Sequence, residues 1–464
     1  MTVSRGLSPL RHRGFRWLAG GQLTSNVGDA FYAVALPWYV LAHHGGALLL
    51  GTVLAAYGVP RTVLVAVGGH ASDRWRPWTV MMAADAVRAV AVAAMAAVAV
   101  AGPASTTLLV PVAVVLGAGE GLFLPGSFAI VPSLLPDEDL QAGNALTSGG
   151  TQLASLAGPA VGGVVVALAG PGPAFAVDAA TFVVSALTLL AIRAQQRAPA
   201  PAVPAPAVAP ARAGSPPPGG ASGAPGQPDV AVAVAEEGEG EGGGEGEVPT
   251  LRRLLASERV LQLILLVTLA ANLGMGGLSE VALPALAHGP FHAGAGGYGG
   301  LIAAFSVGAL AGTLLAGQGR RLARPAVGAS VAFLLEGALM GVIPYLGGAM
   351  PAAAALVVIG ALNGFGNIVT LTAFQRWAPP ALMGRLMGLL MLGSFGAFPV
   401  SVAVSGAIVR AWGPAVFFPV ASVLLVAAVL VGLSQPSWRA FGAEGSPLAG
   451  AGLEGAASCE VAKP

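Results

Sequence analysis

The chain has 464 residues, of which 55% are hydrophobic and only 9% are charged, with a formal net charge of +1. This composition is too apolar for a soluble protein of this length and too neutral for a general nucleic-acid surface. The only lysine, Lys463, and the only cysteine, Cys459, stand near the end of the sequence. A catalytic lysine and a cysteine cluster within the fold are therefore excluded, and we expect a membrane protein that is not an enzyme and needs no cofactor.

Twelve apolar runs are long enough to cross about 30 Å of hydrocarbon. Their continuous hydrophobicity, without two-residue alternation, favours helices over a barrel. We therefore predict an all-α membrane protein with twelve transmembrane helices. The predicted spans lie near residues 17–42, 47–69, 79–101, 106–130, 141–169, 173–192, 260–286, 298–318, 326–348, 351–374, 384–410 and 414–434.

Arginine is distributed unevenly among the loops between these spans. It gathers before the first span and in alternate loops after it, whereas the opposite loops, apart from Arg410, carry almost no charge. Because arginine-rich loops stay on the cytoplasmic side, we predict a multi-pass protein of the cell membrane with both termini in the cytoplasm. The cytoplasmic arginines are Arg5, Arg11, Arg13, Arg16, Arg74, Arg76, Arg320, Arg321, Arg324 and Arg376.

The composition changes abruptly between the sixth and seventh spans. Residues 198–228 are rich in Pro, Ala, Gly and Ser, and residues 236–247 consist only of Glu and Gly. Such segments cannot bury enough apolar surface to fold. The glutamates of residues 236–247 could bind a cation or a basic partner, but a solvated spacer is the favoured interpretation of this segment. We predict an N-terminal half at 1–193, a disordered cytoplasmic linker at 194–249, a C-terminal half at 250–434 and a disordered tail at 435–464.

The two halves share short matches at nearly constant spacing. Val34-Ala35-Leu36-Pro37 recurs 247 residues later as Val281-Ala282-Leu283-Pro284, and Asn26-Val27-Gly28 matches Asn272-Leu273-Gly274 at an offset of 246. Ordered matches of this kind predict two six-helix pseudo-repeats, which place a substrate path between the halves near the midplane. Further matches are Ala55-Ala56-Tyr57 with Ala303-Ala304-Phe305 and Arg76-Pro77 with Arg324-Pro325, both at 248, and Leu135-Pro136 with Ala378-Pro379 at 243.

The segment from Gly69 to Pro77 resembles the loop signature between helices 2 and 3 of the major facilitator superfamily, with Asp73-Arg74 followed by a further basic residue. It departs from the signature where Arg76-Pro77 replaces a Gly and two basic residues. Three other segments, 21–37, 131–146 and 375–389, resemble the branch of macrolide and enterobactin-type exporters. The resemblance covers all twelve helices and implies the major facilitator fold and the activity of a drug or siderophore exporter.

The sequence Gly158-Pro159-Ala160-Val161-Gly162-Gly163 is similar to the signature of drug–proton antiporters, although Ala154 stands where a Gly usually opens it. Proline bends a helix, and glycines admit a close neighbour. The signature therefore favours an antiporter. Ordinary small-residue packing is the alternative.

The loop signature also predicts a gate on the cytoplasmic side. Asp73 could lie against the N-terminus of the helix that starts near Met383, where a carboxylate is stabilised by about 0.3 to 1 kcal/mol. The alternative is a charged loop that only sets the topology. The predicted gate residues are Gly69, Asp73, Arg74, Arg76, Asp85, Arg88, Gln375, Gly384 and Arg385.

Polar residues recur every three or four positions on several predicted helices, so they share one helix face. Such faces suit the wall of a wet cavity, and the alternative is hydrogen bonding between helices. The predicted cavity residues are Gln22, Asn26, Asp29, Arg61, Glu120, Asn144, Thr151, Asn272, Asn363 and Asn367.

A carboxylate at the centre of a membrane helix costs roughly 2.5 to 3.5 kcal/mol, so each acid within a span needs an explanation. Counting about 1.5 Å per residue places Asp29, Glu120 and Arg61 at similar depths. Asp178 and Glu280 fall near the outer helix ends by the same count, and Glu336 belongs to a peripheral helix. We hypothesise that Asp29, with Glu120 as second choice, exchanges a proton with the cavity. Arg61 would then reset the pKa of this acid.

Together these patterns predict a proton-coupled exporter of small hydrophobic or amphipathic molecules that works as a monomer by alternating access. Its partners would be the substrate, protons and the bilayer, with no nucleic acid. No metal site is expected, because Gly289-Pro290 interrupts the helix between His288 and His292. An uptake permease and a non-transporting sensor or scaffold are the alternatives.

Overall fold

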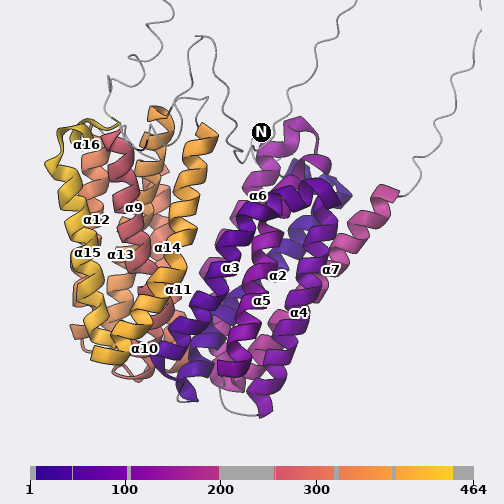
Figure 1. Ribbon diagram of the computed structural model, residues 1–464, viewed down its shortest axis with the longest axis horizontal. Helices are drawn as coiled ribbons and strands as arrows, with labels where there is room; N and C mark the ends of the chain where they lie inside the picture. Colours follow the sequence, from indigo (N-terminus) through magenta and orange to yellow (C-terminus); the bar gives the residue numbers. More distant parts are fainter. Residues whose placement is uncertain are drawn as a thin grey trace, which may run out of the picture.

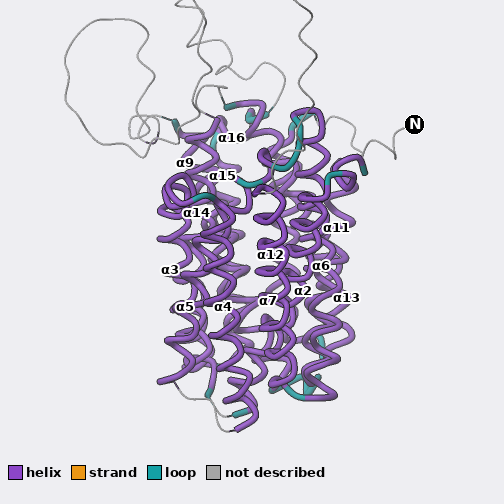
Figure 2. The backbone as a smooth tube through the Cα atoms, turned by 90° about the vertical axis from the view of Figure 1, so that its right-hand side faces the viewer, coloured by secondary structure: helices purple, strands orange, loops and turns teal. Residues whose placement is uncertain are grey.

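The computed structural model describes residues 7–43, 45–101, 106–197, 255, 258–317, 323–378 and 383–442. Within these residues the secondary structure is helical, without strands, and the long helices form twelve rods that run side by side (Figures 1 and 2). The prediction of an all-α protein with twelve long helices is confirmed.

The first half contains six of these rods. Pro77 and Pro171 stand at the first position of α4 and α7, where a missing N–H costs no helical hydrogen bond. Gly170, at φ 83°, reverses the chain between α6 and α7. The elements are η1 (Ser8–Arg11), α2 (Arg13–Ala42), α3 (Gly46–Trp75), α4 (Pro77–Ala101), α5 (Thr106–Ala129), η2 (Val131–Ser133), α6 (Asp137–Ala169) and α7 (Pro171–Arg197).

The second half repeats this order, with one irregularity in its first rod. Here α9 continues through the π-helical turn η3 into α10. The elements are α9 (Arg259–Gly277), η3 (Leu278–Ala282), α10 (Leu283–His288), α11 (Gly294–Gly317), α12 (Pro325–Val342), η4 (Ile343–Tyr345), α13 (Ala349–Trp377), α14 (Met383–Trp412), α15 (Pro414–Ser434) and α16 (Pro436–Ala440).

Among the described residues, eleven rods are both long and apolar enough to span a membrane. The remaining rod, α2, has the length but is less apolar, because it carries Gln22, Asn26 and Asp29. Its neighbours α6 and α7 pack against it and shield much of its surface. A polar first helix is therefore compatible with a place inside the bundle.

The pseudo-repeat is visible in how helices pack within each half. At four glycines on α5 and α13, an added Cβ would collide with a backbone carbonyl of α3 or α11. The contacts are Gly117 on Tyr57 and Gly121 on Arg61 in the first half, and Gly360 on Phe305 and Gly364 on Ala309 in the second. The glycines repeat at an offset of 243 and their partners at 248, the offsets already present in the sequence. The two halves therefore have equivalent helix packing.

The halves meet along α3 with α14 and along α6 with α11, and they converge toward the end that holds α10 (Figure 1). Gly51 approaches Gly406, and Gly163 approaches Gly299, so that an added Cβ would come within about 3 Å of the partner's Cα. Gly51 and Gly299 are related by the offset of 248, and Gly163 and Gly406 by 243. The contact between the halves is therefore approximately two-fold symmetric.

The predicted tail does not begin at residue 435 as expected. Residues 436–440 form α16, in which Trp438 is buried and its indole Nε1 donates to the Ser330 hydroxyl at 2.9 Å. The aromatic ring packs beside Gly432, where no side chain competes for the space. The predicted tail from residue 443 and the predicted linker from residue 198 lie outside the described residues.

Candidate functional site

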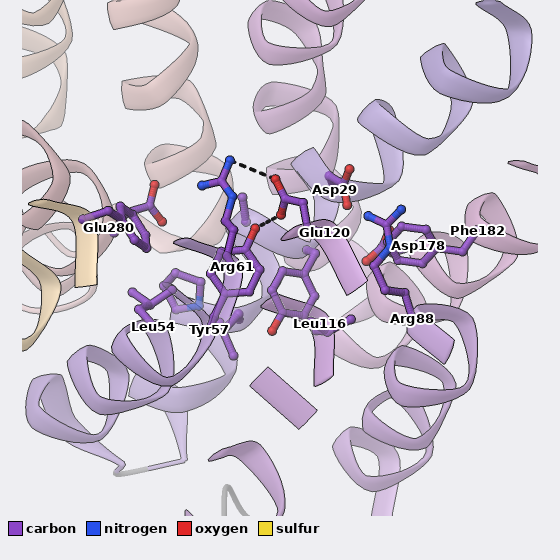
Figure 3. A pocket seen from close by; sticks show the side chains of 15 residues that line it. Asp29, Leu54, Tyr57, Arg61, Arg88, Leu116, Glu120, Asp178, Phe182 and Glu280 are labelled. Carbon is purple, nitrogen blue, oxygen red and sulfur yellow. Dashed lines mark hydrogen bonds and ion pairs between the residues drawn. The ribbon is translucent and has the colours of Figure 1, made fainter. Parts of the chain in front are cut away.

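A cavity of about 240 Å³ lies where the two halves meet (Figure 3). Five helices of the first half build most of its wall, and η3 and α14 supply the side that belongs to the second half. The wall combines apolar surface with six charged side chains. Its residues are Asp29, Tyr32, Ala33, Leu36, Pro37, Leu54, Tyr57, Arg61, Arg88, Leu116, Glu120, Asp178, Phe182, Glu280 and Phe398.

Arg61 and Glu120 form one ion pair in this cavity. Arg61 Nη2 lies 2.9 Å from Glu120 Oε1, and the Tyr57 hydroxyl donates to Glu120 Oε2. The glycines on either side of Glu120, Gly117 and Gly121, let α5 approach the backbone of Tyr57 and Arg61. The close packing of α3 and α5 therefore places the donors opposite the carboxylate.

Arg88 and Asp85 form a second ion pair, with 2.5 Å between Nη2 and Oδ1. Asp85 is fully buried and also accepts from the Ser185 hydroxyl at 2.6 Å. The Arg88 guanidinium lies over the rings of Phe123 and Phe182, at 4.7 and 4.3 Å from their centroids. Both residues were expected at the cytoplasmic gate. Arg88 instead lines the central cavity, because α4 is long enough to bring its twelfth residue to that depth.

Three further carboxylates line the cavity: Asp29, Asp178 and Glu280. Among the described residues none of the three lies within ion-pair distance of an arginine. Among the described residues, the Asp178 carboxylate accepts only a long contact of 3.5 Å, from the Thr181 hydroxyl. An ionised carboxylate without a cationic partner is costly beside apolar walls. These groups are therefore suited to bind a proton or a cation.

The structure brings Asp29, Arg61 and Glu120 to one cavity, as their depths predicted. Asp178 and Glu280, which were placed near the outer helix ends, line the same cavity. The reason is helix length: α7 has 27 residues and is about 40 Å long, so a residue about 10 Å from its end still lies inside the bundle. The sequence already showed that both acids lie within apolar spans. This signal was sufficient to keep both as candidate cavity residues.

The predicted polar faces mostly form hydrogen bonds rather than cavity wall. The Asn26 amide donates to the Thr151 hydroxyl at 3.0 Å and thereby joins α2 to α6. Asn272 donates to its own helix, at the Thr268 carbonyl. Gln22, Asn26, Asn144, Thr151, Asn272, Asn363 and Asn367 are all absent from the lining of the cavity.

In the second half, a short chain of side chains leads to a buried acid. The Asn367 amide donates to Asn363 Oδ1, and the Asn363 amide donates to Glu336 Oε1, both at 2.9 Å. Glu336 is buried on α12. Asn363 and Asn367 are thus brought together, but in a hydrogen-bonded chain inside the second half.

The antiporter-like signature on α6 lies at helix contacts. Gly158 faces Ala30 of α2, and Gly162 faces Phe31. Gly163 approaches α11 of the other half, and the Pro159 carbonyl lies against Gly299. These four residues therefore pack α6 on both α2 and the opposite half.

The structure describes only part of the predicted gate. The surroundings of Gly69, Asp73, Gly384 and Arg385 lie outside its described part. Of the other members, Arg74, Arg76 and Gln375 are exposed, whereas Asp85 and Arg88 are buried. Arg76 has a positive φ of 64° where α3 turns into α4. The contact between Asp73 and the start of α14 stays a prediction.

Comparison with known families and sequences finds partial similarity to secretion effectors and to multidrug efflux pumps. Residues 4–211 match the family described as transmembrane secretion effector. The multidrug efflux pump Tap of Mycolicibacterium fortuitum is 28% identical over 179 residues, 37% of this chain and 44% of the pump. Tap of Mycobacterium tuberculosis (strain ATCC 25618 / H37Rv) is 30% identical over 179 residues, 37% of this chain and 42% of the pump. The chain spans less than half the length of the curated relatives that it matches.

Comparison with solved structures relates the fold as a whole to transporters. A bacterial homologue of the iron transporter ferroportin, in an inward-facing state, has a TM-score of 0.63 at 15% identity and covers 90% of this chain and 98% of its own. The nucleoside transporter NupG has a TM-score of 0.62 at 13% identity and covers 91% and 98%. At these identities the likeness concerns the fold alone.

Proposed function

We propose that this chain belongs to the major facilitator superfamily and exports small hydrophobic or amphipathic molecules in exchange for protons. Membership of the family is supported by the twelve-helix fold, by the match of residues 4–211 to transmembrane secretion effectors and by the partial similarity to Tap pumps. Export, proton coupling and alternating access are also proposed. The chemistry of the central cavity supports them.

The observation that carries the proposal is an excess of carboxylates between the halves. Two arginines are paired there, with Glu120 and Asp85, while Asp29, Asp178 and Glu280 have no cationic partner among the described residues. A carboxyl group that alternates between open and closed surroundings can take up a proton on one side and release it on the other. We assign this role first to Asp29 and second to Glu120.

The remaining wall suits an apolar substrate. Leu36, Leu54 and Phe398 provide hydrophobic surface next to the charged groups, the combination expected for a small-molecule site. Substrate and proton would compete for the same carboxylates, and this competition would couple their movements in opposite directions.

Alternating access follows from the symmetric contact between the halves. Separation of the halves at Gly51–Gly406 and Gly163–Gly299 would open the cavity at the end that holds α10. The end of α3 and the start of α14 would then close the opposite end, which is the role we propose for Asp73. Both termini would lie in the cytoplasm, next to that gate.

The test begins with a compound panel in a pump-deficient host, scored for resistance and for accumulation inside the cells. A compound so identified is then studied with purified protein in liposomes that contain a pH-sensitive dye. Asp29→Asn should abolish substrate-driven proton flux while leaving insertion into the membrane intact. Glu138→Gln, which neutralises an exposed acid outside the cavity, is the control. Full coupled flux in Asp29→Asn eliminates this assignment.

Two alternative functions, an uptake permease and a non-transporting sensor or scaffold, can be distinguished from export in the same host. An uptake permease would raise the intracellular concentration of the compound rather than lower it. A sensor or scaffold would depend on the linker, so deletion of residues 200–247 would abolish its activity, whereas an exporter should retain substantial transport.

A further inference from the structure

The first rod of the second half contains one residue more than its counterpart in the first half. The offset between the halves is 246 at Asn272-Leu273-Gly274 and 247 at Val281-Ala282-Leu283-Pro284, so one residue is inserted between these segments. The structure has the π-helical turn η3 at Leu278–Ala282, while α2 is an uninterrupted α-helix. A π-turn holds one additional residue within a helix, and such turns are frequent at functional sites.

The π-turn is supported by a side chain from another helix. The Tyr298 hydroxyl of α11 donates to the Ser279 carbonyl at 3.1 Å. Tyr298 is only 2% exposed, so its hydroxyl needs a partner within the protein rather than in water. The hydrogen bond therefore fixes the turn from the side facing α11.

Glu280 is the middle residue of this turn, and it lines the central cavity. The residue 247 positions earlier is Ala33, which also lines the cavity but carries no charge. Among the described residues that line the cavity, the π-turn thus contributes the one carboxylate from the second half.

Arg61 stands between this carboxylate and Glu120. In Figure 3 the Arg61 guanidinium is paired with Glu120 on one side, and the carboxylate of Glu280 faces it from the other. The Arg61 side chain also lies over the ring of Phe395 on α14, 4.8 Å from its centroid. One cation of the first half is therefore flanked by an acid of each half.

We infer that Arg61 exchanges its partner, from Glu120 within the first half to Glu280 on the second, and that this exchange links the charge of the cavity to the position of the halves. The guanidinium stays charged under all physiological conditions. When a proton neutralises Glu120, a partly buried cation without a counter-charge is costly. Glu280 is the acid on its free side. The inference deepens the proposed function, because it supplies the step that joins proton binding to movement.

The other charged groups of the cavity do not offer Arg61 an equivalent partner across the halves. Asp29 and Asp178 belong to the first half, and Arg88 is held by Asp85 at 2.5 Å. Tyr57 donates to Glu120. Of the described cavity residues, Glu280 is the acid through which Arg61 can bind the second half.

The experiment measures the separation of the halves without any substrate. Cys459→Ser removes the single native cysteine. Phe128→Cys and Leu371→Cys then provide two cysteines to which spin labels are attached. These are exposed positions on α5 and α13 that are related by the offset of 243. Pulsed electron spin resonance on the purified full chain then gives the distance distribution between the halves.

Glu120→Gln mimics protonation of Glu120. It should change the ratio between the short and long distances of the two labels by roughly fivefold or more, the range of typical coupling between sites. Adding Glu280→Gln should abolish that change. Adding Asp178→Asn, which neutralises a cavity acid beside Arg88, should leave it intact. If Glu120→Gln has no effect, or an equal effect with and without Glu280, the exchange of partners is wrong.

Tyr298→Phe tests the role of the π-turn. It removes only the hydroxyl that supports the Ser279 carbonyl, and it should reduce the response to Glu120→Gln although every charge is retained. An undiminished response would overturn the positioning role of Tyr298. Because these distances are measured without substrate or a proton gradient, failure of export in liposomes would contradict the proposed function and leave this result standing.

Discussion

The two halves have equivalent backbones but different chemistry at equivalent positions. The glycines that press α5 on α3 recur on α13 and α11, at the same offsets. Between those glycines, Glu120 of the first half corresponds to Asn363, and its partner Arg61 corresponds to Ala309. Small residues at backbone contacts therefore preserve the shape of the repeat, while the side chains that face inward are free to differ.

A second pair of equivalent positions shows the same contrast. Arg88 and Glu336 are 248 residues apart, at matching places in α4 and α12. Arg88 is charged and paired with Asp85. Glu336 accepts from Asn363 through one oxygen, and its other oxygen has no hydrogen-bond partner among the residues that the structure describes. A buried carboxylate so poorly compensated is more stable as the neutral acid. The first half thus holds charge pairs where the second is neutral.

Substitution at these matched positions gives the largest expected difference. Arg88→Met leaves the buried Asp85 without its cation and should destabilise the protein by about 3 to 5 kcal/mol. Glu336→Met removes a neutral acid and should cost roughly 1 to 3 kcal/mol, the penalty of leaving the Asn363 amide without its acceptor. Thermal unfolding of the purified protein in detergent measures both.

Adding Asp85→Leu to Arg88→Met removes the stranded charge and should restore much of the lost stability, because a buried ion pair can often be replaced by apolar residues. Equal melting temperatures for Arg88→Met and Glu336→Met would contradict the contrast between the halves.

The backbone equivalence predicts that matched glycines respond alike. Gly117→Val and Gly360→Val should each lower stability by about 1 to 3 kcal/mol or more, because the new side chain meets a carbonyl that cannot move away. The yield of monodisperse protein and its melting temperature are the measurements. Gly149→Val, where an added Cβ meets no atom within 4 Å, is the control. Failure of only one of the two variants would show that the halves pack differently.

The contact between the halves should respond through position rather than stability. Gly163→Val and Gly299→Val both enlarge the same contact and should shift the spin-label distances in the same direction, with the fold retained. The distances between labels at positions 128 and 371 report this shift. Opposite shifts for the two variants would contradict the two-fold arrangement of the contact.

The smallest effect is expected at a single hydrogen bond between the halves. Pro399 has no N–H, so it leaves the carbonyl of Phe395 without a helical donor. The Thr62 hydroxyl, which is shared with the Gly58 carbonyl of its own helix at 2.9 Å, contacts the Phe395 carbonyl at 3.1 Å. Thr62→Val should cost about 0.5 to 1.5 kcal/mol in thermal unfolding. Thr52→Val, whose hydroxyl bonds only to its own helix at Leu48, is the matched control and should cost less.

The sequence by itself determined the helices, the repeat and part of the site. Long apolar runs have to become helices in hydrocarbon, and ordered matches at constant offsets have to produce two similar halves. Depth along a helix can be counted from the sequence, so Asp29, Arg61 and Glu120 were expected together and line one cavity. Polarity could be recognised as well, but whether a polar face meets water or another helix could not.

The tertiary structure decided how each helix is rotated and how far it extends. Glycine contacts fix which face of α5 meets α3, and this sets the partners of Glu120. The length of α7 brings Asp178 into the cavity, and a single inserted residue, absorbed as a π-turn, holds Glu280 there. Rotation and length depend on contacts between residues far apart in the chain, and a linear pattern of hydrophobicity does not contain them.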